Sequence, residues 1–450
     1  MIDSGTMIDS NSVAVILCAG KGTRMKSDCP KILNTILGKT MIAHIMDVLN
    51  RTGFERSIIV CNSENIDLIK TDLKKYNNID YVIQREQIGS ADAINTALNE
   101  TTLNNISSIF VFLGDTPLIT KDDIQSLSKK LDKSDLMIVS FHADDPFGYG
   151  RVIQDEDKNV LKIVEELDAN DDQRKIKTCF SGIMAFKNIK DTKLLNEIKN
   201  NNKKKEFYYT DVIKLANENN LKVGNVLLEY NNLRGVNNYA QLSSAEIILQ
   251  KRIMKNFMEE GVSISLPDTS YIYPDTNIGV NVKIEANVYI GENVIIGDAV
   301  TIKSFSYIEG VDIKENVVIG PFARIRPTSV IEMDSKVGNF VEIKNSHLSS
   351  GVKVNHLTYI GDSEIGEFTN VGAGTITCNF DGEEKYQTKI GKNVFIGSNS
   401  SLVAPLKIND ESYIASGSVI NKDVPEGALA ISRVKQDNKL GWAKKIKKKK

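Results

Sequence analysis

Long apolar runs are missing from this sequence of 450 residues. No segment approaches the ~18 consecutive apolar residues that a membrane-spanning helix needs, so the sequence predicts no membrane partner. The first residues also lack the basic-then-apolar order of a secretory signal peptide. Together these features favour a protein that works in the cytoplasm.

Cysteine is scarce and scattered. The five cysteines are odd in number, and their spacing matches no metal-binding pair. This pattern indicates free thiols in a reducing compartment, which again favours a cytoplasmic location.

An excess of charge of one sign is missing as well. Lysine and arginine number 56 against 58 aspartates and glutamates, so the net charge is −2. This balance gives no support to a nucleic-acid partner. The lysine-rich tail that begins near Arg433 is therefore interpreted as a solvated end of the chain.

What the sequence does contain is an aliphatic residue at nearly every sixth position from residue 278 to residue 420. Period six is neither helical nor simply alternating, and it is typical of a left-handed parallel β-helix built from hexapeptide repeats. Each hexad forms one short face of a triangular coil, with its aliphatic side chain pointing inward. One longer excursion is expected at 377–389. The regular series is Ile278, Ile284, Ile290, Ile296, Ile302, Ile308, Ile313, Ile319, Ile325, Ile331, Val337 and Ile343.

Residues 13–235 alternate between short apolar runs and helical stretches. This alternation predicts an α/β domain, Rossmann-like, with a mostly parallel open sheet and helices on both faces. A further helix over 239–260 is interpreted as a rigid connector. We therefore expect an α/β domain at 1–237, a helical linker at 238–262, and a β-helix domain with a basic tail at 263–450. The expected strands lie near 13–18, 58–60, 81–83, 109–113 and 137–141, and the expected helices near 40–51, 64–75, 90–99 and 121–132.

A glycine-rich segment with two basic residues follows the first strand directly. Residues 17–25 read LCAGKGTRM, and Lys31 comes shortly afterwards. Such a turn at the carboxyl end of a buried strand lets backbone N–H groups approach phosphate oxygens, and Arg24 and Lys31 supply fixed positive charge. The Walker A spacing is absent, which excludes that class of ATP-binding loop. The alternative is a tight turn with solvated basic residues.

Asp115 follows the apolar run at 109–113. In an open α/β sheet this position lies at the carboxyl edge of the strands, where ligands bind. A lone aspartate there is often only a helix cap, so this residue alone leaves both interpretations open.

Arg326, Lys344 and His356 depart from the aliphatic rule on successive coils. They lie about one coil apart, so we expect them to stack along one edge of the β-helix. Two cations suit a phosphate group, and an imidazole beside the carboxylate of Glu342 suits general-base chemistry. The alternative for His356 alone is an ordinary surface histidine.

Several stretches resemble known enzymes. Residues 17–25 with Lys31 resemble the nucleotide signature of the sugar-phosphate nucleotidyltransferases. Both halves in this order, joined by a long helix, resemble the bifunctional family of N-acetylglucosamine-1-phosphate uridyltransferases and glucosamine-1-phosphate acetyltransferases. The resemblance extends over nearly the whole chain from Val13, and its most specific stretches are 338–342 (GNFVE) and 372–379 (GAGTITCN).

For the first half, the resemblance implies transfer of UMP from UTP to N-acetylglucosamine 1-phosphate with release of pyrophosphate. Arg24 and Lys31 would be the catalytic cations, and Asp115 with Asn237 would hold Mg²⁺. The implied substrate contacts are Leu17, Cys18, Ala19, Gly20, Lys31, Gln84, Gly89, Ser90, Leu113, Gly114, Asp115, Gly150, Glu165, Phe180 and Asn237.

For the second half, the resemblance implies acetylation of glucosamine 1-phosphate by acetyl-CoA, with His356 as the base and Glu342 beside it. The family forms homotrimers, with acetyl-transfer sites between neighbouring β-helices. The implied sugar-phosphate contacts are Arg326, Lys344, Tyr359, Asn370 and Lys385. The implied acetyl-CoA contacts are Ala373, Asn379, Phe380, Ser398, Ser416 and Arg433.

Some residues differ from the usual pattern of this family. Two of the changes, at Phe180 and Phe380, remove a polar group close to a substrate. The differences are Phe180 for asparagine, Leu113 for tyrosine, Asp92 for histidine, Leu167 for lysine, Phe380 for tyrosine and Ser416 for alanine.

Two other interpretations stay open. One is a nucleotidyltransferase of single activity with a purely structural β-helix. His356 and Glu342 argue against it, because a structural β-helix has no need of them. The other is a non-catalytic scaffold built on the same folds, which has no need of Arg24, Lys31 or Asp115.

Overall fold

The computed structural model describes residues 8–9, 11–54, 56–103 and 106–447. The chain divides into two compact units, Met1–Leu249 and Gln250–Lys450. The boundary falls inside α8 (Tyr239–Glu259), which is the helix expected over 239–260. Divisions of the chain at 237 and 262 stay predictions. Among the described residues, no helix is long and apolar enough to cross a membrane.

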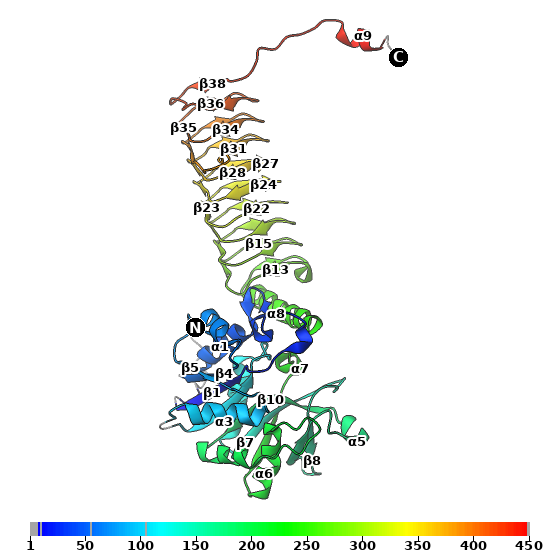
Figure 1. The fold of residues 1–450 in the computed structure, drawn as a ribbon. Coiled ribbons are helices and arrows are strands. Elements are labelled where there is room, and N and C mark those ends of the chain that lie inside the picture. The colour runs from blue at the N-terminus through cyan, green and yellow to red at the C-terminus, as the bar shows by residue number, and fades with distance from the viewer. Residues whose placement is uncertain (1–7, 10, 55, 104–105, 448–450) are drawn as a thin grey trace. The chain divides into compact units, whose positions relative to one another are not determined.

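A mixed, mostly parallel sheet forms the centre of the first unit (Figure 1). Its strands are β1 (Ser12–Leu17), β4 (Arg56–Cys61), β5 (Ile79–Ile83), β6 (Ser108–Leu113), β7 (Leu136–His142), β8 (Arg151–Gln154), β9 (Val160–Val164), β10 (Thr178–Phe186) and β11 (Val223–Leu227). The order is β11-β7-β10-β6-β1-β4-β5, with β8 and β9 attached beside β10. β10 runs antiparallel to β6 and β7, whereas β1 pairs in parallel with β4 and β6. A separate pair consists of β2 (Thr35–Ile36) and β3 (Lys39–Thr40).

Helices cover both faces of this sheet, because successive residues of a strand point to opposite faces. The α-helices are α1 (Met41–Thr52), α2 (Ile66–Asp72), α3 (Ser90–Glu100), α4 (Lys121–Leu131), α5 (Asp171–Arg174), α6 (Val212–Glu218) and α7 (Tyr230–Leu233). The 3-10 helices are η1 (Thr23–Met25), η2 (Lys31–Leu33), η3 (Ile189–Glu197) and η4 (Tyr209–Asp211). In β1, Ala14 and Ile16 join one apolar cluster with α1, α2 and α4, while Val13 and Val15 join another with α3 and α6. Burial on both faces explains why this strand is a continuous apolar run.

The predicted α/β fold is confirmed. The expected strands occur as β1, β4, β5, β6 and β7, and the expected helices as α1 to α4, with ends that shift by a few residues. The sequence patterns did not indicate β8 to β11. In β10 nearly every residue is buried and the register shifts between Phe180 and Met184, so this strand shows no simple alternation.

The second unit is a left-handed parallel β-helix, as predicted (Figure 1). Each coil gives one short strand to each of three parallel sheets. The first sheet holds β12 (Ser263–Ile264), β15 (Lys283–Ile284), β18 (Thr301–Ile302), β21 (Val318–Ile319), β24 (Lys336–Asn339), β27 (Lys353–His356), β30 (Asn370–Val371), β33 (Phe395–Ile396), β36 (Tyr413–Ile414) and β38 (Leu429–Ala430). The second holds β13 (Tyr271–Ile272), β16 (Tyr289–Ile290), β19 (Tyr307–Ile308), β22 (Arg324–Ile325), β25 (Glu342–Lys344), β28 (Tyr359–Gly361), β31 (Ile376–Cys378), β34 (Ser401–Val403) and β37 (Val419–Ile420). The third holds β14 (Asn277–Ile278), β17 (Ile295–Ile296), β20 (Val311–Ile313), β23 (Ser329–Ile331), β26 (His347–Leu348), β29 (Ser363–Ile365), β32 (Thr388–Ile390) and β35 (Leu406–Ile408).

The aliphatic series fills the interior of the coils. Its members from Ile284 to Ile343 are buried, and Ile278 at its start is half-buried. Many corners take a left-handed backbone at asparagine, as at Asn287 and Asn316 with φ of 60° and 58°. Asparagine visits this conformation more readily than most residues, so the corners cause little strain.

Three phenylalanines occupy corners of the same kind. Phe305, Phe322 and Phe340 have φ between 55° and 61°. Their rings stack with centroids 4.9 and 5.1 Å apart, and the side chains are 44 to 55 % exposed. We call this exposed row of rings the phenylalanine ladder.

The regular coils are interrupted and extended at the carboxyl-terminal end. The expected excursion lies between β31 and β32, where Phe380 and Lys385 form an isolated bridge. A short helix, α9 (Trp442–Lys447), lies in the basic tail, and Lys448–Lys450 fall outside the described residues. A 3-10 helix, η5 (Pro267–Thr269), precedes β13 at the other end of this unit.

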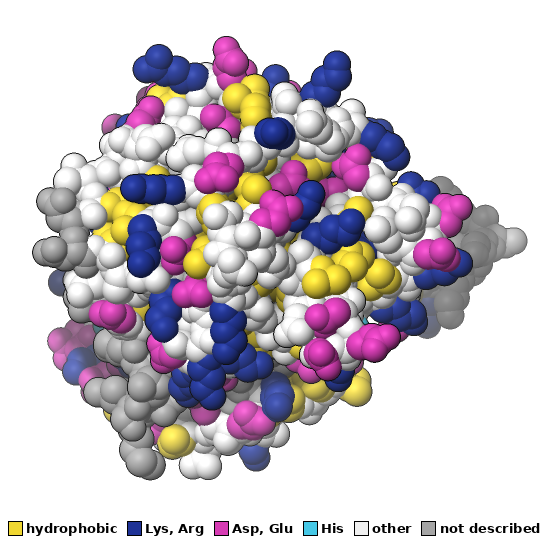
Figure 2. Space-filling view, turned by 90° about the horizontal axis from the view of Figure 1, so that it is seen from below, with side chains coloured by type: hydrophobic (Ala, Val, Ile, Leu, Met, Phe, Trp, Pro, Cys, Tyr) yellow, Lys and Arg dark blue, Asp and Glu magenta, His cyan; other side chains and the backbone are white. Residues whose placement is uncertain are grey.

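On the face seen in Figure 2, basic and acidic side chains are interspersed.

Candidate active sites

A cavity of about 450 Å³, here the first cavity, opens at the carboxyl end of the parallel strands β1, β5 and β6. The segments that follow these strands form its walls, which is where open α/β sheets bind ligands. It is lined by Leu17, Cys18, Ala19, Gly20, Lys21, Lys31, Ile32, Gln84, Gln87, Gly89, Ser90, Ala93, Leu113, Asp115 and Glu206.

Two asparagines after β4 hold the glycine-rich loop of this cavity. Asn65 Nδ2 donates to the Cys18 carbonyl at 2.9 Å, and Asn62 Nδ2 donates to the Ala19 carbonyl at 3.0 Å. A side chain at Gly20 would meet open space, so a ligand can approach the backbone there. The loop is therefore shaped by contacts within the protein before a ligand binds.

Arg24, Lys31, Asp115 and Asn237 converge at the edge of the first cavity, and we call them the cation cluster. Arg24 Nη2 donates to Asn237 Oδ1 at 2.6 Å, and Lys31 Nζ donates to the same oxygen at 3.1 Å. Lys31 also pairs with Asp115 Oδ2, and both side chains are largely buried. The Val236 N–H donates to the Asp115 carbonyl at 2.8 Å, which ties the two segments together.

A second cavity of about 220 Å³ adjoins the first and shares Leu113 and Asp115 with it. It also includes Arg24 and Asn237 of the cation cluster. Two bound molecules, one in each cavity, would therefore meet at this cluster. The remaining lining residues are Thr116, Gly148, Tyr149, Gly150, Glu165, Phe180, Ser181, Gly182, Tyr209 and Gly235.

The wall of the second cavity combines one buried carboxylate with aromatic rings. Burial raises the pKa of Glu165, although the Thr210 hydroxyl donates to its Oε1 at 3.1 Å and opposes the rise. Phe180 packs against Tyr209 with ring centroids 5.7 Å apart, and the Tyr209 hydroxyl donates to the Gly182 carbonyl at 2.6 Å. Phe180 therefore offers packing at a position where an asparagine would offer hydrogen bonds.

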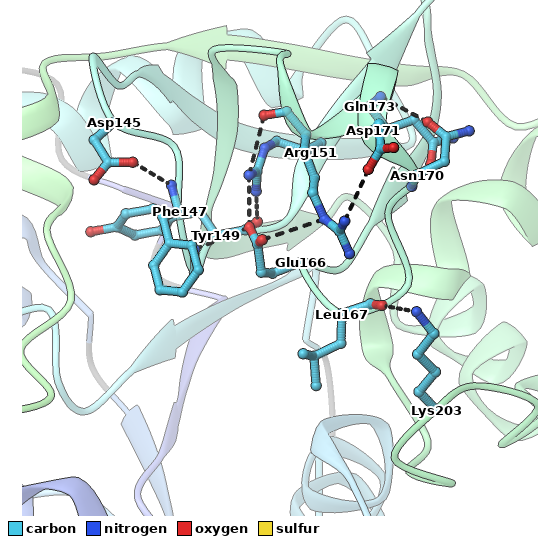
Figure 3. A network of polar contacts seen from close by, with 12 residues as sticks. Asp145, Phe147, Tyr149, Arg151, Glu166, Leu167, Asn170, Asp171, Gln173 and Lys203 are labelled. Atoms are coloured by element: carbon cyan, nitrogen blue, oxygen red, sulfur yellow. Dashed lines mark hydrogen bonds and ion pairs between the residues drawn. The ribbon is translucent and has the colours of Figure 1, made fainter.

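A buried ion pair supports the loop that carries Gly148 and Gly150 (Figure 3). Arg151 is 1 % exposed, and its Nη2 lies 2.7 Å from Glu166 Oε2. Arg151 Nη1 donates to the Tyr149 carbonyl, and Glu166 Oε2 accepts from the Gly148 N–H at 3.1 Å. Burial favours the neutral acid, but the hydrogen bonds from Arg151 and Gly148 prevail and hold the pKa of Glu166 below its usual value. The pair is therefore ionised at neutral pH and fixes the loop from two sides.

In the second unit, His356 lies at the corner between the first and second sheets. It is in register with Asn339 of the preceding coil, and its Nδ1 contacts Asn339 Oδ1 at 2.6 Å. Because an amide oxygen only accepts hydrogen bonds, Nδ1 is the donor in this contact, and in the neutral imidazole the lone pair then lies on Nε2. His356 is exposed, so this lone pair is open to a substrate.

The same corner continues from His356 toward the carboxyl terminus, and we call it the corner column. Hydrogen bonds to backbone carbonyls connect its levels. They run from Gly374 N–H to His356 (3.3 Å), Asn399 N–H to Ala373 (2.7 Å), Gly417 N–H to Ser398 (2.8 Å) and Arg433 Nη1 to Ser416 (3.1 Å). The column thus places four predicted acetyl-CoA contacts in line with His356.

A group of cations lies along the second sheet. Arg326 Nη1 pairs with Glu342 Oε1 at 2.9 Å, and about a third of each side chain is exposed. Lys344 lies beside Lys385, whose hydrogen bond and charge hold the pKa of Lys344 below its usual value. Two adjacent ammonium groups repel each other, so an anion bound between them would be stabilised.

The prediction that Arg326, Lys344 and His356 stack along one edge is confirmed for Arg326 and Lys344 and wrong for His356 in the single chain. Arg326 directly follows β22 and Lys344 ends β25, at equivalent positions of neighbouring strands of the second sheet, whereas His356 ends a strand of the first. Asn339 and His356, which do stack, are 17 positions apart in sequence, whereas Lys344 precedes His356 by only 12. The prediction that Glu342 lies beside the imidazole is also wrong. Asn339 contacts His356 in its place, and Glu342 pairs with Arg326.

Most predicted contacts of the first unit line one of the two cavities, and their roles stay predictions. Gly114 lies behind the first cavity, where its N–H donates to the Leu17 carbonyl at 3.1 Å. In the second unit, Tyr359 begins β28 and Asn370 begins β30, while Asn379 donates to Asp362 near the excursion. Sequence reasoning missed Asn62, Asn65, Glu166 and Asp362. Arg151 and Asn339 lay within segments that resemble the family, but no contact was predicted for either side chain.

Comparisons with known proteins agree with this architecture. The family model of the MobA-like NTP transferase domain matches residues 14–178, and that of the bacterial transferase hexapeptide (six repeats) matches residues 275–310 and 387–422. Three relatives bear the name "Bifunctional protein GlmU". The protein of Zymomonas mobilis is 43% identical over 97% of this chain and 98% of its own length. Those of Bartonella quintana and Caldicellulosiruptor saccharolyticus are 39% and 40% identical over 97% of this chain, and over 97% and 98% of their own lengths.

The fold and the two sites define a class of protein, a nucleotidyltransferase joined to a hexapeptide acyltransferase in one chain. With relatives of this identity over almost its full length, the chain belongs to the GlmU family. It is a bifunctional enzyme of UDP-N-acetylglucosamine synthesis, and its co-substrates are acetyl-CoA and UTP. No finding favours the single-activity enzyme or the scaffold.

The Arg151–Glu166 pair gives a prediction for the second cavity. Glu166→Gln removes the charge that faces a fully buried guanidinium, so the Gly148–Gly150 loop loosens. We expect KM for N-acetylglucosamine 1-phosphate to rise about tenfold, the equivalent of about 1.4 kcal/mol. KM for UTP and the acetyl-transfer rate should stay within about twofold, measured on the same preparation.

Arg174→Lys is the matched control, because Arg174 is 44% exposed and lies 3.8 Å from Glu166. Equal effects of the two variants would contradict a specific role of the buried pair.

The Asn339 contact gives a second prediction. Asn339→Leu removes the acceptor that keeps the proton on His356 Nδ1. We expect kcat of acetyl transfer to fall about a hundredfold, a typical loss when a general base is misaligned. Asn339→Asp retains an acceptor and should keep most of the activity. Equal loss in both variants, with unchanged melting temperature, would contradict this assignment.

Proposed function

We propose that uridyl transfer takes place at the cation cluster, where the two cavities meet. The first cavity would hold UTP, with its phosphates over the glycine-rich loop and its base near Gln84 and Gly89. The second would hold N-acetylglucosamine 1-phosphate, with Glu165 accepting hydrogen bonds from sugar hydroxyls. The observation that supports this most directly is the convergence of Arg24 and Lys31 on the junction.

In this arrangement an oxygen of the sugar phosphate attacks the α-phosphorus of UTP, and the bond to pyrophosphate breaks. A sugar phosphate has its second pKa at about 6, so it is largely dianionic at neutral pH and needs no strong protein base. Arg24 and Lys31 would neutralise the phosphates and align them for displacement. Pyrophosphate leaves with the electron pair of the broken bond.

We propose Mg²⁺ as the metal, held by Asp115 and Asn237. Asp115 Oδ1 is buried and accepts no hydrogen bond within the described part of the chain, which is the mark of a ligand oxygen. Two protein oxygens with substrate phosphates and water suit Mg²⁺, which seldom has an all-protein cage. Among the described residues there is no cluster of three or more His, Cys, Asp or Glu side chains that could hold a metal alone. When bound, Mg²⁺ would add to the neutralisation of phosphate charge.

We propose that acetyl transfer takes place at the corner column. His356 Nε2 would take a proton from the ammonium group of glucosamine 1-phosphate, and the freed lone pair would attack the thioester carbon of acetyl-CoA. The carbon–sulfur bond then breaks, the nitrogen loses its second proton, and the sulfur takes up that proton, so coenzyme A leaves as a thiol. Arg326, Lys344 and Lys385 would hold the sugar phosphate, whose charge relieves the repulsion between the two lysines.

We propose a homotrimer that completes this second site. The phenylalanine ladder lies on the same corner as His356. The Phe340 N–H donates to the Phe322 carbonyl, and in the next coil the N–H of Leu357, which follows His356, donates to the Asn339 carbonyl, which precedes Phe340. Exposed aromatic surface beside a catalytic residue suits a subunit contact. His356 and the proposed phosphate-binding cations lie on different sheets of one chain. A neighbouring subunit would therefore bring its own cations beside the His356 of the first subunit. UTP and acetyl-CoA as substrates support a cytoplasmic location.

Two substitutions should separate the two activities. His356→Ala should lower acetyl transfer by about 10² to 10⁴-fold and leave pyrophosphate release from UTP unchanged. Asp115→Asn should do the reverse, with a loss of roughly a hundredfold or more because metal charge stabilisation is lost. Thiol release from acetyl-CoA and pyrophosphate release from UTP measure the two reactions. Full uridyl transfer in Asp115→Asn would overturn the metal assignment.

Two of the three rings of the ladder can be removed without straining the coils. Phe305→Asn with Phe322→Asn places at these corners the residue that other corners already use, and leaves Phe340, the ring nearest His356. We expect unchanged unfolding temperature of the β-helix, a smaller sedimentation coefficient and loss of acetyl transfer, with uridyl transfer retained. A double variant that keeps the wild-type mass in solution would exclude Phe305 and Phe322 as the subunit contact.

A further inference from the structure

One side chain of the first cavity, Gln84, is held in a single orientation by groups that only accept hydrogen bonds. Gln84 follows β5 and is 4 % exposed. Its backbone N–H donates to the Cys61 carbonyl at 2.9 Å, and its carbonyl accepts from Gln87 Nε2 at 3.0 Å. The backbone is thus fixed on both sides, and only the orientation of the side-chain amide is left to be decided.

The two hydrogens of the Gln84 amide are both engaged. Nε2 donates to the Gly89 carbonyl at 3.0 Å and to Asp92 Oδ2 at 2.8 Å. A carbonyl and an ionised carboxylate accept hydrogen bonds and donate none. Turning the amide over would place Oε1 against two oxygen atoms, so the chemistry of the neighbours sets its orientation.

Both neighbours are themselves held firmly. The Gly89 carbonyl also accepts from the Ala93 N–H at 3.3 Å, and Ile88 and Ala91 on either side of Gly89 are hydrogen-bonded to the Phe207 backbone, so this segment is held in place. Asp92 lies in the first turn of α3, an 11-residue helix, where the helix dipole favours a negative charge. This place in the helix favours the Asp92 carboxylate as a hydrogen-bond acceptor.

The opposite side of the amide is open to a ligand. In the described part of the chain, Gln84 Oε1 receives no hydrogen bond, and it is not among the side-chain oxygens that are buried without a partner. Gln84 also lines the first cavity. Gln84 therefore presents a hydrogen-bond acceptor, Oε1, to the cavity, and its amide hydrogens are both used elsewhere.

We propose that Asp92 is a positioning residue for the choice of base. By holding the Gln84 amide, it presents Oε1 to the ring nitrogen of a pyrimidine that carries a hydrogen there, as uracil does at N3. Cytosine has a lone pair at N3, which would face Oε1 and leave two acceptors opposed. This inference rests on the proposed uridyl transfer and extends it to the residue that enforces the selection.

The test compares the ratio of kcat/KM for UTP to that for CTP in pyrophosphate release with N-acetylglucosamine 1-phosphate. Asp92→Leu removes the acceptor at nearly constant size, so the second amide hydrogen loses its partner and the amide is free to turn toward the cavity. We expect the ratio to fall about tenfold or more, because one discriminating hydrogen bond is no longer enforced. Asp92→Asn still offers an acceptor oxygen and should keep the ratio within about threefold.

The ratio of the two kcat/KM values separates the effect of the Gln84 orientation from the effect of the Asp92 charge. Loss of the negative charge changes the binding of UTP and of CTP equally, so this effect cancels in the ratio. Glu100→Gln, at the exposed end of the same helix, is the control for a carboxylate change on α3. Acetyl transfer measured on each preparation reports the integrity of the chain, and calorimetric titration with UTP and CTP repeats the comparison without turnover.

The outcomes are distinguishable. A wild-type enzyme that releases no pyrophosphate from UTP contradicts the proposed function itself. A wild-type enzyme that strongly prefers UTP, with an unchanged preference in Asp92→Leu, overturns the role of Asp92 and leaves the proposed function intact.

Discussion

Parallel pairing of strands in register is the constraint on which both units depend. In the first unit β1 pairs in parallel with β4 and with β6, so the ends of these strands meet at one edge. That edge brings together the glycine-rich loop, Asn62 and Asp115, which are far apart in sequence. In the second unit the same kind of pairing stacks equivalent positions of successive coils, and it sets Asn339 beside His356. The geometry of both candidate sites follows from backbone register.

Charge is arranged differently in the two sites. In the cation cluster, Lys31 faces Asp115, so positive and negative groups are already matched before a substrate binds. On the β-helix, Lys344 and Lys385 face each other, and the effect of Lys385 outweighs that of the Asp362 carboxylate, so the pKa of Lys344 is lowered. The first arrangement suits a site where a divalent cation and two phosphate-bearing substrates meet. The second suits a site that recognises one phosphate group.

Three residues that depart from the family pattern make contacts with other residues of this chain. Phe180 packs on Tyr209 instead of offering an amide, and Asp92 fixes Gln84. Leu167 is exposed, and the Lys203 ammonium reaches its carbonyl. Phe180 lines the second cavity and Asp92 contacts Gln84 of the first, while Arg24, Lys31 and Asp115 of the cation cluster follow the family pattern. Differences from the family therefore occur in and behind the walls of the two cavities, and these three residues of the cation cluster are unchanged.

Three features could be predicted from the amino-acid pattern alone: the β-helix interior, the alternating α/β unit and the glycine-rich loop with Arg24 and Lys31. Each depends on local periodicity or on adjacent residues, and these follow from backbone geometry alone. Tertiary structure decided which groups touch: Asn62 and Asn65 under the loop, Arg151 with Glu166, and Asn339 with His356. The error about a shared edge for Lys344 and His356 has the same origin. Their 12-residue separation is less than the 17 positions that separate Asn339 from His356, and only the register of the coil shows which side chains meet.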